Sequence, residues 1–199
     1  MKKKDVLLVI GMQVDMLPGG ALEVPGGAEL IPIINDLMGE FEEVIAANFC
    51  LPPGHLSFAG NHPWRKPGQV VSVNGVDVEL EIMYCVQDSF GAAFPPGFAV
   101  DRISHIVEMA AEEDAIPHSA FFDTGNPRST GLKEYLSSMP VKKLYLCGMP
   151  FDPIVVNTAI DAKKLGYEVE VLKSACRMRQ PQRLNEMLNM LEANGIAVN

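Results

Sequence analysis

The stretch VLLVIGMQVD, residues 6–15, joins a run of five apolar residues to a glycine and a more polar segment. An uninterrupted apolar run of this length is typical of a strand buried on both faces of a parallel sheet. Further strand-like segments follow at residues 44–47, 103–109, 144–149, 167–172 and 196–198. Helical patterns separate them at residues 29–41, 129–136, 154–165 and 182–193. This alternation predicts an α/β fold with a parallel sheet covered on both faces, in which ligands bind at the carboxyl ends of the strands.

Turn residues mark the ends of several of these elements. Asn74-Gly75 separates the apolar segments 70–73 and 76–80, which is a strong signal for a β-hairpin. Ser129 or Thr130 is the expected N-cap of the second helix, and Gly166 is expected to end the third.

The composition indicates a globular protein with one core. The chain has 199 residues, which suits a single domain spanning residues 1–199. Its formal net charge of −9 argues against nucleic acid and anionic membranes as partners, because both need a basic surface. No apolar run is long enough to cross a bilayer, and the run at residues 6–10 is too short for the core of a secretion signal. A cytoplasmic location is therefore expected.

The cysteines are Cys50, Cys85, Cys147 and Cys176, with no C-x-x-C pair and no zinc-ligand spacing among them. Reduced and mostly buried thiols are expected in a cytoplasmic chain.

Several segments, in colinear order, resemble the nicotinamidase/isochorismatase-like cysteine hydrolases along nearly the whole chain. That family begins with an apolar strand, D-x-Q-N-D-F and L-P-G-G-x-L, and Leu7 to Leu22 follows this pattern with replacements. The other similar segments are His55–Ala59 with Asn61–Pro63, Cys85–Gln87, Ser119–Asp123 with Ser129–Leu132, Leu146–Asp152 with Thr158–Tyr167, and Ala175–Arg177. Any one segment is a weak signal, but their order makes accident improbable. The resemblance implies a three-layer α/β/α fold with a mainly parallel six-stranded sheet.

Members of that family hydrolyse an amide or related bond with a cysteine thiolate at a helix N-terminus, where the helix dipole lowers its pKa. An Asp takes the thiol proton and a Lys supports the Asp. The resemblance places these three groups at Ile154, Gly11 and Met109. No lysine occurs between Lys66 and Lys133, so a small shift of the alignment does not restore one. None of the three residues can act as nucleophile, base or cation.

In nicotinamidases an Asp and several His bind a metal ion, and the resemblance places these ligands at Phe49, Leu51, His55 and Tyr84. A lone His rarely holds a divalent ion, so we expect no metal and no other cofactor. His55 is interpreted as a loop residue that hydrogen-bonds locally. Pro150 takes the position of an oxyanion donor, and the Met149–Pro150 bond is predicted to be cis.

The remaining pocket positions implied by the resemblance hold Gln13, Asp15, Met16, His118, Phe151 and Asp152. Gln13 and Asp15 are interpreted as partners of loop backbone. Because apolar groups replace polar ones, a drier and more apolar cavity is expected. The side chains expected to fill part of it are Met16, Phe49, Phe151 and Ile154.

These replacements favour a catalytically inactive member of the family, a pseudoenzyme that binds an uncharged small molecule or pairs with a partner subunit. One alternative is an active hydrolase of an amide C–N bond with a rearranged site that uses Cys50, Cys85 or His118. Another is a structural role through oligomer contacts. A homo-oligomer is expected because members of the family often form dimers or larger assemblies.

Overall fold

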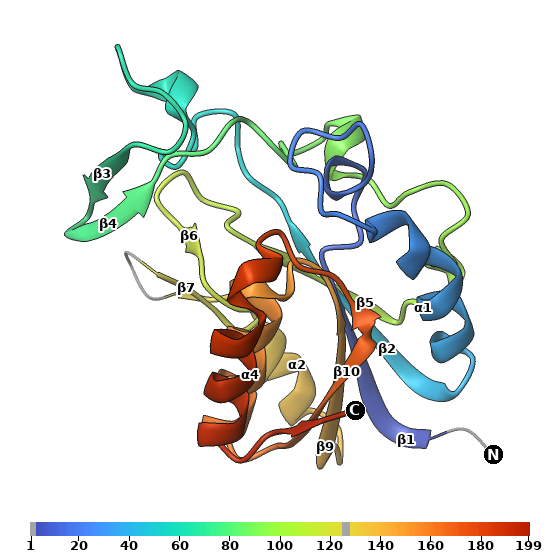
Figure 1. Ribbon diagram of the computed structural model, residues 1–199. Coiled ribbons are helices and arrows are strands. Elements are labelled where there is room, and N and C mark those ends of the chain that lie inside the picture. Colours follow the sequence, from blue (N-terminus) through green and yellow to red (C-terminus); the bar gives the residue numbers. More distant parts are fainter. Residues whose placement is uncertain (1–2, 125–127) are drawn as a thin grey trace.

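The computed structural model describes residues 3–124 and 128–199 of the chain. A six-stranded sheet runs through its centre in the order β11-β10-β9-β1-β2-β5, and all neighbouring strands are parallel (Figure 1). The strands are β1 (Lys3–Ile10), β2 (Phe41–Phe49), β5 (His105–Met109), β9 (Lys143–Gly148), β10 (Glu168–Cys176) and β11 (Ala197–Val198). The predicted α/β fold with a parallel six-stranded sheet is thus confirmed.

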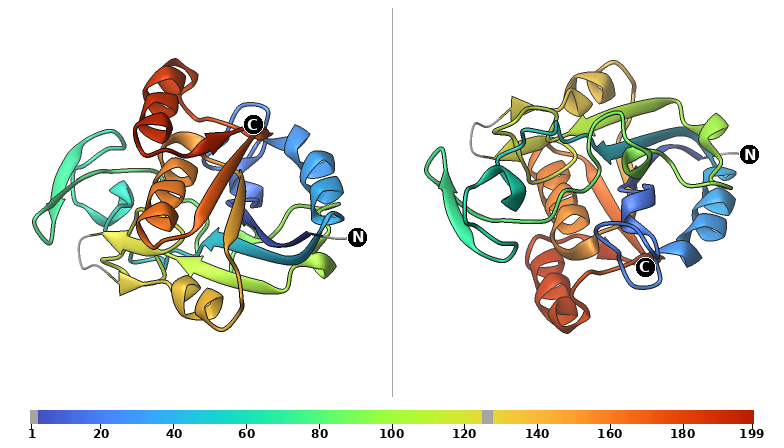
Figure 2. Two further views of the ribbon diagram at one scale, coloured as in Figure 1. Left: turned by 90° about the horizontal axis from the view of Figure 1, so that it is seen from below. Right: turned by 90° about the horizontal axis from the view of Figure 1, so that it is seen from above.

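Helices cover both faces of this sheet. The helix α1 (Leu30–Met38) lies on one face, and α2 (Leu132–Ser137), α3 (Val156–Lys164) and α4 (Leu184–Ala193) lie on the other (Figure 2). Right-handed crossovers account for this division, because β1-α1-β2 steps across the sheet in one direction and β9-α3-β10-α4-β11 steps in the opposite direction. No helix in the described parts of the chain is long and apolar enough to span a membrane.

The hydrophobic core is built around the central strand β1. Residues Val6–Ile10 are at most 1% exposed, because β1 is paired on both edges and covered on both faces. Ile10 pairs with Ala47 of β2 and with Gly148 of β9, so the carboxyl ends of the three central strands meet at one edge of the sheet. In sheets of this kind that edge is where ligands bind.

The ends of the elements differ from the sequence prediction at several places. The strand β10 continues past Leu172 to Cys176, which pairs with Gly148 after a shift in register. The N-cap of α2 is Gly131, with φ of +90°, and not Ser129 or Thr130 as predicted. A left-handed backbone of this kind is open mainly to glycine. The Thr130 hydroxyl still accepts the Leu132 N–H at 3.3 Å while it donates to the Ala120 carbonyl oxygen at 2.6 Å.

The helix α3 ends as predicted. Gly166 follows its last turn with φ of +96°, and the Gly166 N–H donates to the Lys163 carbonyl oxygen at 3.0 Å.

Two small sheets lie outside the main one. The strands β3 (Val70–Val73) and β4 (Val76–Glu79) form the antiparallel hairpin predicted around Asn74-Gly75. This hairpin belongs to an arm, residues 59–81, that projects from the body of the molecule (Figure 1). The strands β6 (Ile116–Pro117), β7 (Phe122–Thr124) and β8 (Arg128–Ser129) form a second antiparallel sheet. The sequence did not predict it, because strands of two or three residues leave no periodic pattern.

Candidate functional site at the carboxyl edge of the sheet

The three positions that the resemblance assigns to catalysis lie at the carboxyl edge of the sheet. Gly11 directly follows β1, Met109 is the last residue of β5, and Ile154 lies in the π-helical turn Phe151–Val155 that leads into α3. Met109 is fully buried and Ile154 is 5% exposed, and both side chains belong to the hydrophobic core. Two apolar side chains and a glycine backbone therefore occupy these three positions.

Gly11 has a backbone conformation that excludes a side chain. Its φ is +64°, in the left-handed region that residues with a Cβ disfavour. A Cβ built on Gly11 would lie 1.9 Å from the Met149 carbonyl oxygen and 3.3 Å from Cε2 of Phe49. The Gly11 N–H donates to the Ala47 carbonyl oxygen, and the Met149 N–H donates to the Ile10 carbonyl oxygen, each at 2.9 Å. An aspartate at position 11 would thus require hydrogen-bonded backbone to move.

The turn before α3 is tied to the end of β10 by Asp152. The Asp152 carboxylate accepts the backbone N–H groups of Arg179 and Gln180, each at 2.8 Å. The Met149–Pro150 and Asp152–Pro153 peptide bonds are cis, the first as predicted. Pro150 has no N–H, so its backbone cannot donate at the position where the resemblance places an oxyanion donor.

The four positions assigned to metal ligands do not fit a metal ion. Phe49 and Leu51 are buried and apolar, and their side chains carry no donor atom. His55 is buried, with Nδ1 2.7 Å from the Ser57 hydroxyl and Nε2 3.1 Å from a backbone carbonyl oxygen. Burial also raises the pKa of the Tyr84 hydroxyl, so Tyr84 stays a neutral phenol. No group of three His, Cys, Asp or Glu residues within 3–124 and 128–199 could hold a metal ion.

Gln13 and Asp15 hydrogen-bond to the loops around the site. The Gln13 side chain donates to the Phe49 carbonyl oxygen and accepts the Phe49 N–H, both at 2.8 Å. The Asp15 carboxylate accepts the Cys85 N–H at 2.7 Å. Met16 is fully buried in the core. These side chains hold backbone segments in place.

None of the four cysteines has surroundings that favour a thiolate. Burial and the nearby Glu108 carboxylate raise the pKa of Cys50 to about 11. Burial raises the pKa of Cys176 to about 12 and also raises the pKa of Cys85 and Cys147. At neutral pH these groups are therefore protonated thiols, which are poor nucleophiles.

His118 is paired with a carboxylate of α3. Its Nε2 lies 3.4 Å from an oxygen of Asp161, and the Asn157 side-chain amide donates to the His118 carbonyl oxygen at 3.1 Å. Burial favours the protonated form of Asp161, but the neighbouring side chains of His118, Ser119 and Lys164 together hold the pKa of Asp161 below its ordinary value. His118 therefore interacts with a negatively charged group.

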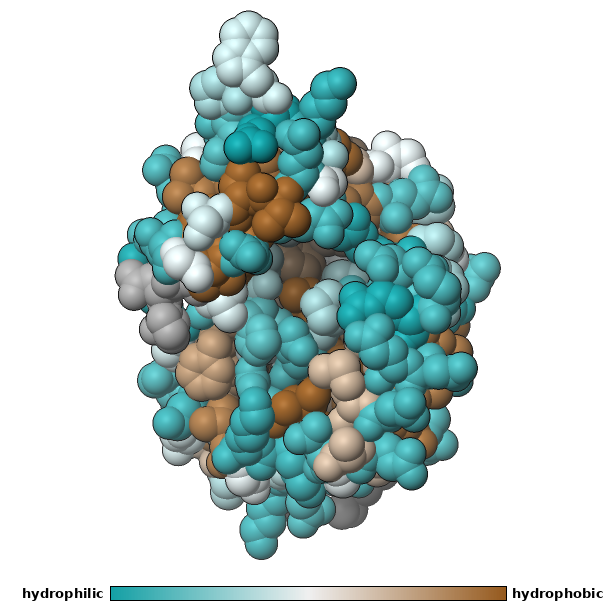
Figure 3. Space-filling view, turned by 60° about the vertical axis from the view of Figure 1, so that its left-hand side comes forward, coloured by the Kyte–Doolittle hydropathy of each residue, from teal (hydrophilic) through white to brown (hydrophobic). Residues whose placement is uncertain are grey.

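A cavity of about 310 Å³ opens at this edge of the sheet, under the projecting arm (Figure 3). We call it the rim cavity. It is lined by Ser57, by residues 77–79 and 81 of the arm, by Tyr84, Ile116 and Pro117, by Asp152 and Pro153, and by Arg179, Gln180 and Arg183. Of the pocket residues expected from the sequence, only Tyr84 and Asp152 line this cavity. The others are buried in the core, hydrogen-bond to neighbouring segments, or, like Phe151, line a different cavity.

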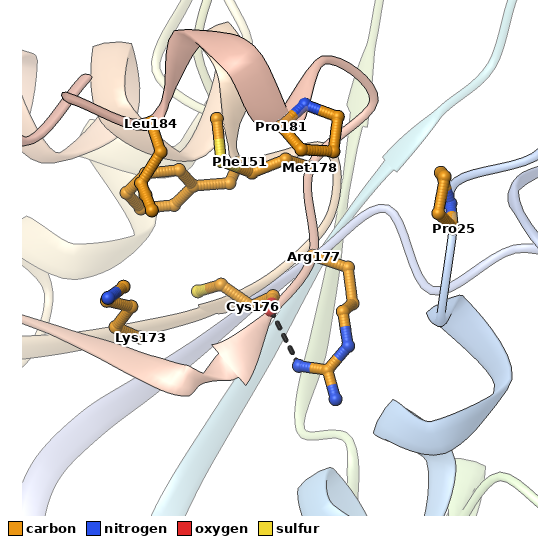
Figure 4. A pocket seen from close by; sticks show the side chains of 8 residues that line it. All are labelled: Pro25, Phe151, Lys173, Cys176, Arg177, Met178, Pro181 and Leu184. Atoms are coloured by element: carbon orange, nitrogen blue, oxygen red, sulfur yellow. Dashed lines mark hydrogen bonds between the residues drawn. The ribbon is translucent and has the colours of Figure 1, made fainter. Parts of the chain in front are cut away.

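A second cavity, of about 320 Å³, lies between the loop before α1 and the connection from β10 to α4 (Figure 4). Phe151, Met178 and Leu184 gather on one side of it, while the Arg177 side chain folds back onto the Cys176 carbonyl oxygen at 2.8 Å. Its other lining residues are Pro25, Lys173 and Pro181. This apolar cavity contains none of the positions assigned to catalysis or metal binding.

The structure thus differs from the expectation of an apolar cavity at the former catalytic positions. Phe49, Met109 and Ile154 pack into the core there, and the cavity that opens at the rim has charged as well as apolar side chains in its lining. The sequence reasoning also missed Arg179, Ile116 and Pro117, which come from segments distant in the chain. Arg179 carried one usable signal, since it lies in the loop that follows the carboxyl end of the parallel strand β10.

Comparison with known proteins gives matches along the whole fold. Residues 84–198 match the family model described as the Isochorismatase domain. The chain is 33% identical to the nicotinamidase of Escherichia coli over 178 residues, which covers 86% of this chain and 82% of that protein. The structure superposes on a nicotinamidase from Acinetobacter baumanii with a TM-score of 0.93 and 28% identity, covering 100% and 96% of the two chains. It superposes on the yeast nicotinamidase bound to the inhibitor nicotinaldehyde with a TM-score of 0.91 and 29% identity, covering 98% of both.

Proposed function

The chain belongs to the isochorismatase domain family, with nicotinamidases among its relatives, and from this premise we propose that it is a catalytically inactive member that binds a small molecule. The observation that carries the proposal is the backbone at Gly11. A Cβ at this position would meet the Met149 carbonyl oxygen at 1.9 Å, so the position of the general base cannot hold a carboxylate on this backbone.

The other two catalytic positions support the same proposal. Hydrolysis through a cysteine needs a nucleophile activated by a base. Ile154 offers a branched hydrocarbon where the nucleophile would stand, and Met109 offers a thioether where the cation would stand. Both side chains are buried in the core, and neither carries a group that could react with a substrate or activate a water molecule.

The main alternative is an active hydrolase of an amide C–N bond with a rearranged site. The names of the relatives favour it, because the similar proteins are nicotinamidases. It requires a new nucleophile, and the candidates are Cys50 and Cys85, with His118 as a base. The raised pKa values of both thiols argue against this alternative, as does the burial of Cys85.

Release of ammonia from nicotinamide separates the two proposals. We expect no ammonia above the protein-free blank, with or without added zinc, iron or manganese, because Ile154 cannot form an acyl intermediate and Gly11 and Met109 cannot activate a nucleophile. The nicotinamidase of Escherichia coli serves as the positive control under the same conditions. Turnover that disappears in Cys50→Ala or Cys85→Ala would establish the rearranged site and refute the proposed inactivity.

A further inference from the structure

The Tyr84 side chain lines the rim cavity, and its hydroxyl makes no hydrogen bond within residues 3–124 and 128–199. The side chain is 6% exposed, and its ring is packed edge-on by Phe49 and Phe58 at centroid separations of 5.8 and 5.9 Å. No atom of the residues that the structure describes hydrogen-bonds to this hydroxyl, which is not sealed from the cavity. A donor in the wall of a cavity that no protein acceptor satisfies is free to bond a ligand, so this position favours a ligand that supplies an acceptor.

Tyr84 acts as a donor at this position. Burial raises the pKa of Tyr84, and the negative charge of Glu81 acts in the same direction, so the hydroxyl keeps its proton. Arg179 adds more N–H groups to the same cavity. Its guanidinium bonds both carboxylate oxygens of Glu81, at 2.8 and 3.4 Å, and has further N–H groups beyond these two bonds.

The charges around the rim cavity disfavour an anion. The cation of Arg179 is neutralised by Glu81, and Arg183 is paired with Glu186 outside the cavity. The lining also carries the carboxylates of Asp77 and Glu79, and neither forms an ion pair with Arg179 or Arg183, the cations of the lining. A carboxylate or phosphate ligand would therefore enter a region of negative potential.

The walls and the size of the cavity favour a single ring with apolar surface. Val78, Ile116, Pro117 and Pro153 supply apolar surface on three segments of the chain. The volume of about 310 Å³ is at the lower end of the range for small-molecule sites. It accommodates one substituted ring and is too small for a dinucleotide.

We propose that the rim cavity binds an uncharged, single-ring molecule whose carbonyl oxygen or equivalent acceptor receives the hydrogen bond of Tyr84. This inference rests on the proposed function, because it names the ligand class of a member that binds without hydrolysing. It assigns the recognition of the ligand to a tyrosine at a position where the family resemblance implies a metal ligand.

Acetophenone is a suitable probe, because it has a ring and a carbonyl group but no amide bond. Its binding tests the cavity whatever the outcome of the ammonia assay, so the two proposals can fail separately. Ethylbenzene, which has a similar shape and no acceptor, and benzoate, which is an anion, complete the series. Saturable binding of each is measured by ligand-observed NMR titration to the wild-type chain and to Tyr84→Phe.

The variant Tyr84→Phe removes only the hydroxyl, and loss of an unpaired buried group should leave the melting temperature unchanged or higher. Tyr167→Phe is the matched control, because Tyr167 packs on Phe121 and does not line the rim cavity. Ile116→Phe narrows the cavity from another wall and provides a second, independent perturbation.

We expect acetophenone to bind more tightly than ethylbenzene and benzoate. In Tyr84→Phe its affinity should fall about threefold to tenfold, the value of one neutral hydrogen bond, while ethylbenzene is unaffected. Ile116→Phe should weaken acetophenone and ethylbenzene alike, and Tyr167→Phe should change neither. Equal affinity for acetophenone and ethylbenzene, unchanged binding in Tyr84→Phe or in Ile116→Phe, or no saturable binding of acetophenone would each overturn the inference.

Discussion

Replacement of Gly11 by alanine measures how firmly the structure excludes a side chain at the position of the catalytic base. The added Cβ would lie 1.9 Å from the Met149 carbonyl oxygen, well below any van der Waals contact. Gly19 provides a matched control, because its φ of +84° is also left-handed and no atom lies within 4 Å of its Cβ position. The two substitutions share the backbone penalty and differ in the steric clash.

The expected magnitudes follow from these two terms. A residue with a Cβ in the left-handed region costs about 1–2 kcal/mol, and Gly19→Ala should lose only this amount of unfolding free energy. Overpacking of a filled site adds about 1–3 kcal/mol or more, so Gly11→Ala should lose about 2–5 kcal/mol. That is a large part of the 5–15 kcal/mol that typically stabilises a domain.

Urea denaturation followed by circular dichroism gives the free energy of unfolding of the wild type and of each variant under the same conditions. We expect Gly11→Ala to be clearly less stable than Gly19→Ala. Equal losses in the two variants would show that the segments of Met149 and Gly11 separate easily. The argument that position 11 cannot hold a carboxylate would then be refuted.

The remaining predictions concern other groups near this edge of the sheet. Glu108 helps to hold the pKa of Cys50 at about 11, so Glu108→Gln should speed alkylation of Cys50 by iodoacetamide at pH 8. The control Glu192→Gln should not change this rate, and equal alkylation rates in Glu108→Gln and the wild type would contradict the stated environment of Cys50. Burial raises the pKa of Asp123 from 3.8 to about 7, so the folded state keeps a proton that the unfolded state loses between these values. The free energy of unfolding should therefore fall as the pH rises from about 4 to 7, by more in the wild type than in Asp123→Asn, and parallel pH profiles would argue against a raised pKa. Asp152→Ala should cost about 2–6 kcal/mol in urea denaturation because two backbone N–H groups lose their acceptor, and Asp152→Asn, which keeps one acceptor, should cost less; an unchanged stability in Asp152→Ala would contradict this role.

Much of the fold was predictable because the central strands are uninterrupted apolar runs in the sequence. Strands such as β1 are buried on both faces, so their apolar runs are visible without any alignment. The part of β10 beyond Leu172 was not predicted, because residues 173 and 174 are exposed and polar. The Gly131 cap was missed because the sequence shows neither the positive φ of Gly131 nor the tertiary bond from the Thr130 hydroxyl to the Ala120 carbonyl oxygen.

The candidate site was less predictable than the fold. The sequence identifies which side chains stand at Gly11, Met109 and Ile154, but it gives no backbone angle for Gly11 and no packing for the other two. It also does not show that the arm of residues 59–81 reaches over the rim to close a polar cavity with Arg179. Tyr84 shows what the sequence can and cannot predict. Its place at the pocket was expected, but the surroundings of its hydroxyl depend on segments that meet only in the folded chain.

Formation of nicotinate with the protein in molar excess over nicotinamide tests the central claim most directly, because one turnover per molecule is then detectable. The account predicts no nicotinate beyond the protein-free rate, since the positions of nucleophile, base and cation hold Ile154, Gly11 and Met109. Nicotinate that appears in proportion to the protein, and that disappears after alkylation of its thiols, would contradict it.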